Sequence, residues 1–175
     1  MRRLADEARI QRFMRSLGSS AREETRVYFT GGVSAVLVGW RASTIDVDMA
    51  LVPDRDDLLR ALPTLKEQLE INIELASPSD FLPELPGWEE RSQFIARERG
   101  ASFYHYDFYA QALAKIERGH AQDRGDIEAM LEAGLVQPAR LRELFDTIVP
   151  QLYRYPAVDP TSLRRALDEA LVGRG

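Results

Sequence analysis

The sequence predicts an α/β fold, in which a small mixed β-sheet is flanked by helices and is followed by a C-terminal helical bundle. Three observations predict it. Residues 27–51 have the pattern of a strand, a glycine pair, a helix, a turn and a second strand. Residues 45–75 have the pattern of a strand, a helix and a strand, a crossover that places both strands in one sheet. From residue 107 the pattern is helical, so we expect a core over residues 1–106 and a helical region over residues 107–175.

The composition is that of a globular protein. Of 175 residues, 45% are apolar, which suits one compact domain or a catalytic domain with a helical extension. The absence of cysteine excludes disulfides and zinc–thiolate sites. The charged N-terminus lacks a signal-peptide core and no apolar run is long enough to span a membrane, so we expect a cytoplasmic protein without a membrane partner. The net charge of −5 does not indicate a nucleic-acid binder, although a local basic patch would suffice.

An amphipathic helix is predicted over residues 3–17. Its apolar stripe consists of Leu4, Ile10, Phe13, Met14 and Leu17. We expect this stripe to pack on the sheet, and we favour that interpretation over an RNA-contacting role for the basic side chains of the helix.

The glycine pair Gly31-Gly32 ends the first strand of the core. Residues 27–29 before it are β-prone, and the apolar segment 33–39 after it predicts a helix that begins at the glycines. A helix N-terminus carries unpaired N–H groups and a partial positive charge, and glycines let a phosphate approach the backbone. The pair therefore suits a triphosphate, although a glycine pair after a strand is more often an ordinary turn.

Asp46 and Asp48 are the candidate metal ligands. The alternation over residues 45–51 places the apolar side chains on the opposite face of the strand, and these are Ile45, Val47 and Met49. Two carboxylates about 6–7 Å apart on one strand face repel each other unless cations lie between them, and Mg²⁺ prefers oxygen ligands. A solvated strand face is the alternative interpretation.

The turn before the aspartate strand contains Arg41, Ser43 and Thr44. Arg41 could balance phosphate charge, and either hydroxyl could place a phosphate or orient Asp46. Ordinary turn hydroxyls are the alternative.

A helix over residues 54–69, with a kink or break at Pro63, is predicted to link the aspartate strand to a strand over residues 70–75. The second strand alternates as well, so Asn72 and Glu74 are expected to share a face opposite the apolar positions 71, 73 and 75. Glu74 is a candidate third carboxylate, with a solvent-facing glutamate as the alternative.

Residues 76–88 predict an ordered loop, and Arg99-Gly100 between residues 92–98 and 101–106 indicates a hairpin. Four aromatic side chains near the end of this hairpin are expected to be mostly core residues, with stacking on a base as the alternative. They are Tyr104, Tyr106, Phe108 and Tyr109.

Four helices are predicted after the hairpin, over residues 107–118, 120–133, 138–149 and 160–172. Lys115 lies on an otherwise apolar stretch of the first, where an amine must reach water or meet an anion. Asp123 and Asp126 lie three apart on one face of the second helix, and Asp123 is equally consistent with a charge partner at a helix N-terminus.

Together, the motif Gly31-Gly32, thirteen residues and Asp46-Val47-Asp48 resembles the signature of the nucleotidyltransferase fold shared with DNA polymerase β. Residues 39–48 are most similar to the AbiEii-type toxin branch and to small related proteins of unassigned role. The helical Lys115, followed by an arginine and then by Asp123 and Asp126, resembles the second signature of that branch.

The resemblance implies a Mg²⁺-dependent nucleotidyltransferase that moves a nucleoside monophosphate from an NTP to an acceptor hydroxyl. It implies that Asp46 and Asp48 bind two Mg²⁺ ions, for which Mn²⁺ could substitute. Glu74 would complete the metal site, although the family more often has aspartate there. Lys115 would stabilise the leaving phosphates, with the helical region completing the active site. The NTP is expected to contact Gly31, Gly32, Ser34, Arg41, Ser43, Thr44, Lys115 and Asp123.

The sequence leaves the acceptor open. RNA, especially the 3′ end of tRNA, is the leading expectation from the resemblance, in a bacterial toxin–antitoxin or phage-defence setting. AMPylation of a partner protein such as an antitoxin comes second, and a small molecule such as an aminoglycoside third. The full AbiEii-type toxins have a larger C-terminal helical region than this chain. A non-catalytic module that binds a nucleotide or a protein is the alternative to any enzyme.

Overall fold

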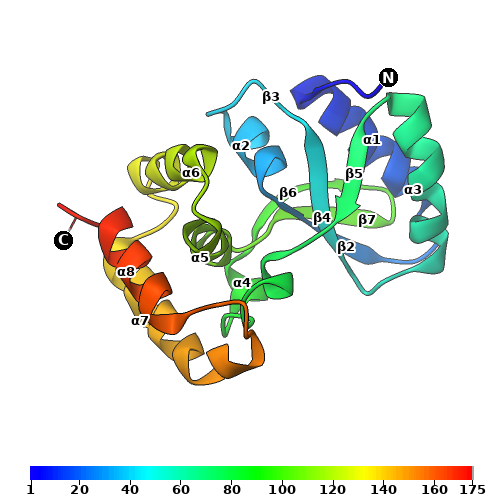
Figure 1. Cartoon of the computed structure of the whole chain (residues 1–175). Helices are drawn as coiled ribbons and strands as arrows, with labels where there is room; N and C mark the ends of the chain where they lie inside the picture. Colours follow the sequence, from blue (N-terminus) through cyan, green and yellow to red (C-terminus); the bar gives the residue numbers. More distant parts are fainter. Residues whose placement is uncertain (175) are drawn as a thin grey trace. The chain divides into compact units, whose positions relative to one another are not determined.

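A five-stranded mixed sheet carries the three candidate metal ligands, Asp46, Asp48 and Glu74 (Figure 1). The computed structural model describes residues 1–174. The strand order is β5-β4-β2-β7-β6, with β2 (Thr25–Thr30), β4 (Asp46–Val52), β5 (Asn72–Leu75), β6 (Gln93–Glu98) and β7 (Ala101–His105). β4 runs antiparallel to β2 and parallel to β5, whereas β7 runs parallel to β2 and antiparallel to β6. The predicted mixed sheet, including the strand–helix–strand crossover from β4 to β5, is confirmed.

The chain divides into two compact units. The first comprises Met1–Ser77 and Ser92–Tyr106, and the second comprises Pro78–Arg91 and Asp107–Gly175. The segment after β5 therefore groups with the C-terminal helices rather than with the sheet.

Three helices pack against the sheet in the first unit: α1 (Glu7–Ser20), α2 (Gly32–Val38) and α3 (Asp56–Leu69). α1 and α3 lie side by side (Figure 1). The core between helices and sheet is apolar and includes Ile10, Phe13, Leu17, Val27, Phe29, Val47, Met49, Leu58, Leu62, Ile73 and Phe103. The residues that alternate with the core residues lie on the other face of the sheet, and they include Asp46 and Asp48 of β4 as well as the stacked Tyr28 and Tyr104.

The N-terminal helix begins later than the sequence predicts. Residues Ala5–Asp6 form a short strand, β1, which pairs with β3 (Ser43–Thr44) in a separate two-stranded sheet. The Asp6 side chain then caps α1 by accepting a hydrogen bond from the backbone N–H of Arg9. The apolar stripe of the helix is buried as expected except for Leu4, which precedes β1 and is exposed.

Three local expectations about α3 and the strands need correction. α3 is not broken at Pro63, because the tertiary packing of Leu58, Leu62 and Leu65 outweighs the hydrogen bond that proline cannot make. Ile45 lies just before β4 and is 70% exposed, so it does not share the buried face. Leu75, at the end of β5, is likewise 52% exposed.

The predicted hairpin is confirmed as β6 and β7, joined by a turn in which Arg99 has a φ of 50°. Tyr104 of β7 stacks on Tyr28 of β2, with ring centroids 5.2 Å apart. Tyr106 packs edge-on against Tyr28 at 6.1 Å and is buried. These contacts fit the interpretation of the aromatic residues as part of the core.

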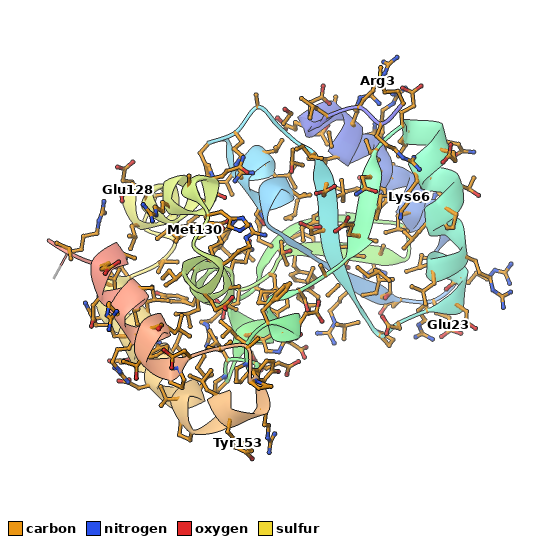
Figure 2. The ribbon with its side chains drawn as sticks, viewed as in Figure 1. Arg3, Glu23, Lys66, Glu128, Met130 and Tyr153 are labelled. Carbon is orange, nitrogen blue, oxygen red and sulfur yellow. The ribbon has the colours of Figure 1, made fainter. Side chains whose placement is uncertain are left out.

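The second unit is helical. It contains the 3₁₀ helix η1 (Pro78–Asp80), α4 (Trp88–Arg91), α5 (Phe108–Arg118), α6 (Ala121–Glu132), α7 (Pro138–Ile148), the 3₁₀ helix η2 (Val149–Arg154) and α8 (Pro160–Ala170). The Arg91 side chain pairs with Asp107 at 2.6 Å, which ties α4 to the start of α5. Met130 lies in the interior of this unit, whereas Tyr153 projects outward (Figure 2). The predicted helical C-terminal region is confirmed.

No helix within residues 1–174 combines the length and the apolar character needed to cross a membrane.

Candidate active site

Asp46 and Asp48 share one face of β4. The strand alternates in burial, with Val47 and Met49 fully buried and the two aspartates half-buried. The predicted separation of apolar and acidic faces is therefore confirmed for β4 itself. The carboxylates lie on the side of the sheet away from the apolar core.

Glu74 lies directly beside Asp48. β5 runs parallel to β4 with Asp46 opposite Asn72 and Asp48 opposite Glu74, and neighbouring strands are about 4.8 Å apart. Register partners point to the same face of a sheet, so Glu74 joins the two aspartates there. The side chain of Glu74 is exposed, as expected at an edge strand.

Asn72 is a member of this group that the sequence did not single out. Its Nδ2 donates to Asp46 Oδ1 at 2.6 Å and to Glu74 Oε1 at 3.0 Å. The amide thus bridges two carboxylates that would otherwise repel each other. Alternation in β5 predicts that Asn72 and Glu74 share a face, but the bridge to Asp46 depends on the register between β5 and β4.

The glycine turn lies against this acidic group. Gly31 has a φ of 63°, a conformation that favours glycine, and a Cβ at this position would lie 3.2 Å from Asp48 Oδ2. The turn between β2 and α2 therefore passes beside the second aspartate. The predicted proximity of the glycine pair and the aspartate strand is a feature of the structure.

Gly32 is required by a different contact. A Cβ there would overlap the side chain of Thr44 and lie 3.2 Å from Nη1 of Arg41. Thr44 is buried, and its Oγ1 donates to the backbone oxygen of Asp46 at 3.2 Å. Arg41, Thr44 and the glycine pair therefore lie together, and Ser43 is the neighbour of Thr44 in β3.

Ser34 lies under the glycine turn, in the first turn of α2. Its side chain is fully buried, and its Oγ lies 2.9 Å from Nδ1 of His105. The hydroxyl also donates to the backbone oxygen of Phe29 at 3.4 Å. No sequence pattern marks His105, because the contact joins residues 71 positions apart in the chain.

Lys115 and Asp123 lie in the second unit, in a buried ionic network between α5 and α6. Lys115 Nζ lies 2.8 Å from Asp126 Oδ2 and 3.6 Å from Asp123 Oδ1. Arg118 makes two hydrogen bonds to Asp123, from Nε at 2.8 Å and from Nη2 at 2.5 Å. The anion that the position of Lys115 requires is therefore supplied by Asp126 and Asp123.

The charges around Asp123 set its titration. Burial by itself would raise the pKa of the Asp123 carboxyl. The hydrogen bonds and charge of Arg118, together with the charge of Lys115, outweigh burial and leave the pKa below its usual value. Asp123 is thus an anion at neutral pH and balances the two cations with Asp126.

The donor set on the sheet suits a hard divalent cation in its chemistry. Asp46, Asp48 and Glu74 offer carboxylate oxygens on one face, as Mg²⁺ prefers. Within residues 1–174, however, no group of three or more His, Cys, Asp or Glu side chains is arranged to hold a metal ion. The amide of Asn72 occupies one oxygen of Asp46 and one of Glu74, so Oδ2 of Asp46 and Oε2 of Glu74 are not used by it.

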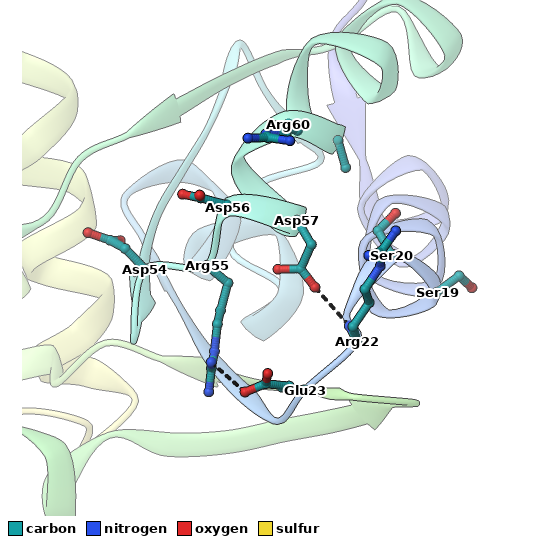
Figure 3. A pocket seen from close by; sticks show the side chains of 10 residues that line it. Ser19, Ser20, Arg22, Glu23, Asp54, Arg55, Asp56, Asp57 and Arg60 are labelled. Carbon is teal, nitrogen blue, oxygen red and sulfur yellow. Dashed lines mark hydrogen bonds and ion pairs between the residues drawn. The ribbon is translucent and has the colours of Figure 1, made fainter.

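A pocket of about 850 Å³ lies elsewhere on the first unit (Figure 3). It lies between the end of α1 and the start of α3, and so at the opposite end of β4 from Asp46. It is lined by Ser19, Ser20, Arg22, Glu23, Asp54, Arg55, Asp56, Asp57, Arg60 and Ala61. Arg55 pairs there with Glu23 at 2.5 Å, and the backbone N–H of Arg22 donates to Asp57 at 2.8 Å. None of its lining residues is among those predicted to bind an NTP.

Comparison with known proteins identifies the family. The model of a family described as "Nucleotidyltransferase of unknown function (DUF6036)" matches residues 8–155, so the chain belongs to that family. The match confirms the expected nucleotidyltransferase superfamily and enzyme class, for which an NTP is the substrate. The closer resemblance to AbiEii-type toxins stays a prediction. Comparisons with curated proteins and with solved structures gave no match.

Proposed function

We propose that this member of the nucleotidyltransferase family transfers a nucleoside monophosphate from an NTP to an acceptor hydroxyl, at the sheet face that carries Asp46 and Asp48. One observation supports it above the others. The glycine turn passes so close to Asp48 that a Cβ on Gly31 would lie 3.2 Å from the carboxylate. A backbone that accepts phosphates and an acid pair that accepts cations are thus neighbours, as a metal-bound triphosphate requires.

Asp46 and Asp48 would hold two Mg²⁺ ions, or Mn²⁺, with Glu74 as the third ligand. When bound, these ions supply positive charge at the attacking and leaving oxygens. Glu74 would also help to deprotonate the acceptor. The amide of Asn72 keeps Asp46 and Glu74 together in the absence of cations, because it donates to both.

The phosphates would lie on the backbone of Gly31 and Gly32. Arg41 lies beside Gly32 and would balance phosphate charge, and the hydroxyls of Ser43 and Thr44 would orient the phosphates or Asp46. Ser34 is buried, so its contribution to NTP binding would be made through the position of the turn rather than by direct contact.

Lys115 and Asp123 remain predicted NTP-binding residues on the strength of the family resemblance. A buried lysine that is held by two aspartates can serve the stability of the helical unit, the leaving phosphates, or both.

RNA, with the 3′ end of tRNA foremost, is the acceptor that we propose, in a toxin–antitoxin or phage-defence setting. A partner protein that becomes AMPylated is the second candidate. Both acceptors present a hydroxyl to the same NTP site, so the proposed chemistry is common to them.

A transfer assay tests the proposal. Wild type, Asp46→Asn and Asp56→Asn are incubated with Mg²⁺, each of the four α-labelled NTPs, and either total RNA or a whole-cell protein extract. Asp56 is an exposed aspartate that lines the remote pocket. Asp56→Asn therefore removes the same charge as Asp46→Asn, but away from the candidate site. We expect wild type and Asp56→Asn to label one fraction, and Asp46→Asn to lose at least about a hundredfold in rate, as removal of a key electrostatic group does. Transfer by folded Asp46→Asn at the wild-type rate would exclude the assignment.

A further inference from the structure

His105 is a buried histidine at the end of β7 that has no part in the proposed transfer. It is 8% exposed, and burial lowers its pKa from 6.5 to about 4, so the ring is neutral at physiological pH. The other histidine of the chain, His120, has a side chain that is 70% exposed. A neutral imidazole has one N–H donor and one acceptor nitrogen, so its tautomer decides what it can bind.

Ser34 is a partner of this ring. Ser34 Oγ lies 2.9 Å from His105 Nδ1 and 3.4 Å from the backbone oxygen of Phe29. A hydroxyl can donate and accept, and a carbonyl oxygen can only accept. With the proton on Nδ1 the ring donates to Oγ, and with the proton on Nε2 the hydroxyl donates to Nδ1. The 2.9 Å contact is therefore a hydrogen bond between Ser34 and His105 in either tautomer.

Phe29, Ser34 and His105 lie at the ends of the elements that flank the glycine turn. Phe29 in β2 and His105 in β7 are register partners, and Ser34 lies in the first turn of α2. Gly31 and Gly32 lie between Phe29 and Ser34 in the chain. The two hydrogen bonds therefore fasten the end of β2, the start of α2 and the end of β7 around the two glycines.

We propose that His105 is a positioning residue, which through Ser34 holds the glycine turn in place beside Asp48 and Thr44. The consequence for NTP binding rests on the proposed function, whereas the effect on the turn does not. The tolerance at the turn is small, because Gly31 lies close to the Asp48 carboxylate and Gly32 has no room beside Thr44. A turn that moved would present different N–H groups to the phosphates.

Nuclear magnetic resonance of the imidazole nitrogens tests the geometry directly. The two histidines give two sets of ¹⁵N signals, and the His120→Gln variant assigns them. At pH 7 we expect His105 to be neutral, and we expect its Nδ1 signal to shift in Ser34→Ala, in which the hydrogen-bond partner of Nδ1 is lost. An Nδ1 signal that is unchanged in Ser34→Ala would overturn the proposal, whether or not the protein transfers nucleotides.

Variants test the consequence. His105→Leu removes the hydrogen-bonding nitrogen at similar volume, whereas His105→Asn can keep an amide group, which can donate or accept, near the position of Nδ1. With Mg²⁺ present, we expect His105→Leu to weaken NTP binding about tenfold, the effect of one lost neutral hydrogen bond, and His105→Asn to restore most of the affinity. Ser34→Ala should match His105→Leu, and the double variant should be no weaker, because both changes remove the same bond.

Hydrogen exchange separates this role from general stability and from the proposed function. In the ligand-free protein, the amides of residues 31–33 should exchange faster in His105→Leu than in His105→Asn, while those in the middle of β4 stay protected. Equal exchange and equal NTP affinity in wild type and His105→Leu would overturn the proposal. If His105→Leu does not fold, Ser34→Ala provides the same comparison. Wild type that binds no NTP would contradict the proposed function, and the exchange comparison would still decide the positioning role.

Discussion

Gly32 and Thr44 determine how closely α2 approaches the aspartate strand. The turn hydroxyl of Thr44 donates to the backbone of Asp46, and its side chain occupies the space that a Cβ on Gly32 would need. The glycine is therefore required by packing as well as by any phosphate. A glycine pair can be recognised in the sequence, but the residue that makes it necessary cannot.

Gly32→Ala should destabilise the protein by about 1–3 kcal/mol, the usual cost of overpacking a site that has no room. It should also weaken NTP binding, because the turn must move away from Thr44. Urea unfolding measures the first effect and nucleotide titration the second.

Gly125→Ala is the matched control. Gly125 lies inside α6 with nothing within 4 Å of the added Cβ, so alanine should raise the free energy of unfolding by about 0.5–1 kcal/mol. A Gly32→Ala variant that is as stable as wild type would contradict the packing around Thr44.

His105 predicts a dependence of stability on pH. Its pKa is about 4 in the folded state and 6.5 without burial, so between these values the unfolded chain binds more protons. The free energy of unfolding should therefore fall as the pH falls from 6.5 to 4, by at most about 3 kcal/mol for this residue.

Urea unfolding of wild type and His105→Asn at several pH values isolates the contribution of His105 from that of the carboxylates. The difference in the free energy of unfolding between the two proteins should change between pH 6.5 and pH 4 and stay constant above pH 7. A constant difference at all pH values would show that burial does not disfavour the charged imidazole.

At the scale of elements, α5 and α6 are joined by buried charges. Lys115 in α5 meets Asp126 and Asp123 in α6, and Arg118 completes the balance of two cations and two anions. The amine on an apolar helix face thus finds its anions within its own unit. The sequence predicts that the amine reaches water or meets an anion, but it does not say which anion, because a phosphate and a carboxylate satisfy the same requirement.

Asp126→Ala should cost about 3–5 kcal/mol of stability, because it leaves the buried Lys115 ammonium without its nearest anion. The double variant Lys115→Met with Asp126→Leu should cost much less, since no unpaired charge remains. Thermal unfolding measures both. A loss below about 1 kcal/mol for Asp126→Ala would mean that Lys115 does not depend on this partner.

The double variant also separates the two roles of Lys115. If it folds and has wild-type transfer activity, Lys115 serves stability alone. If it folds and loses transfer, the predicted role of Lys115 at the leaving phosphates is supported.

At the scale of the molecule, the alternation of apolar and polar residues and the turn residues between segments predict most of the elements. Buried Val47 and Met49 between half-buried aspartates, the hairpin at Arg99-Gly100 and the helices after residue 107 follow from local patterns. Local patterns also explain why the crossover from β4 to β5 was expected in one sheet.

The remaining features depend on contacts between distant segments. The central pairing of β2 with β7 joins residues more than 70 positions apart, and no local pattern specifies it. The Asn72 bridge depends on register, and the continuity of α3 through Pro63 depends on packing. Local patterns can also mislead. Ile45 fits the alternation of β4 but lies just before the strand, and its side chain is exposed.

The position of the label in the NTP tests the central claim most directly. Wild type is incubated with Mg²⁺, the active acceptor fraction and one NTP that carries the label either on the α- or on the γ-phosphate. Nucleotidyl transfer predicts that the α-label joins the acceptor and that the γ-label is released in pyrophosphate. A γ-label on the acceptor, or release of inorganic phosphate without labelling of any acceptor, would contradict the account of a nucleotidyltransferase site at Asp46 and Asp48.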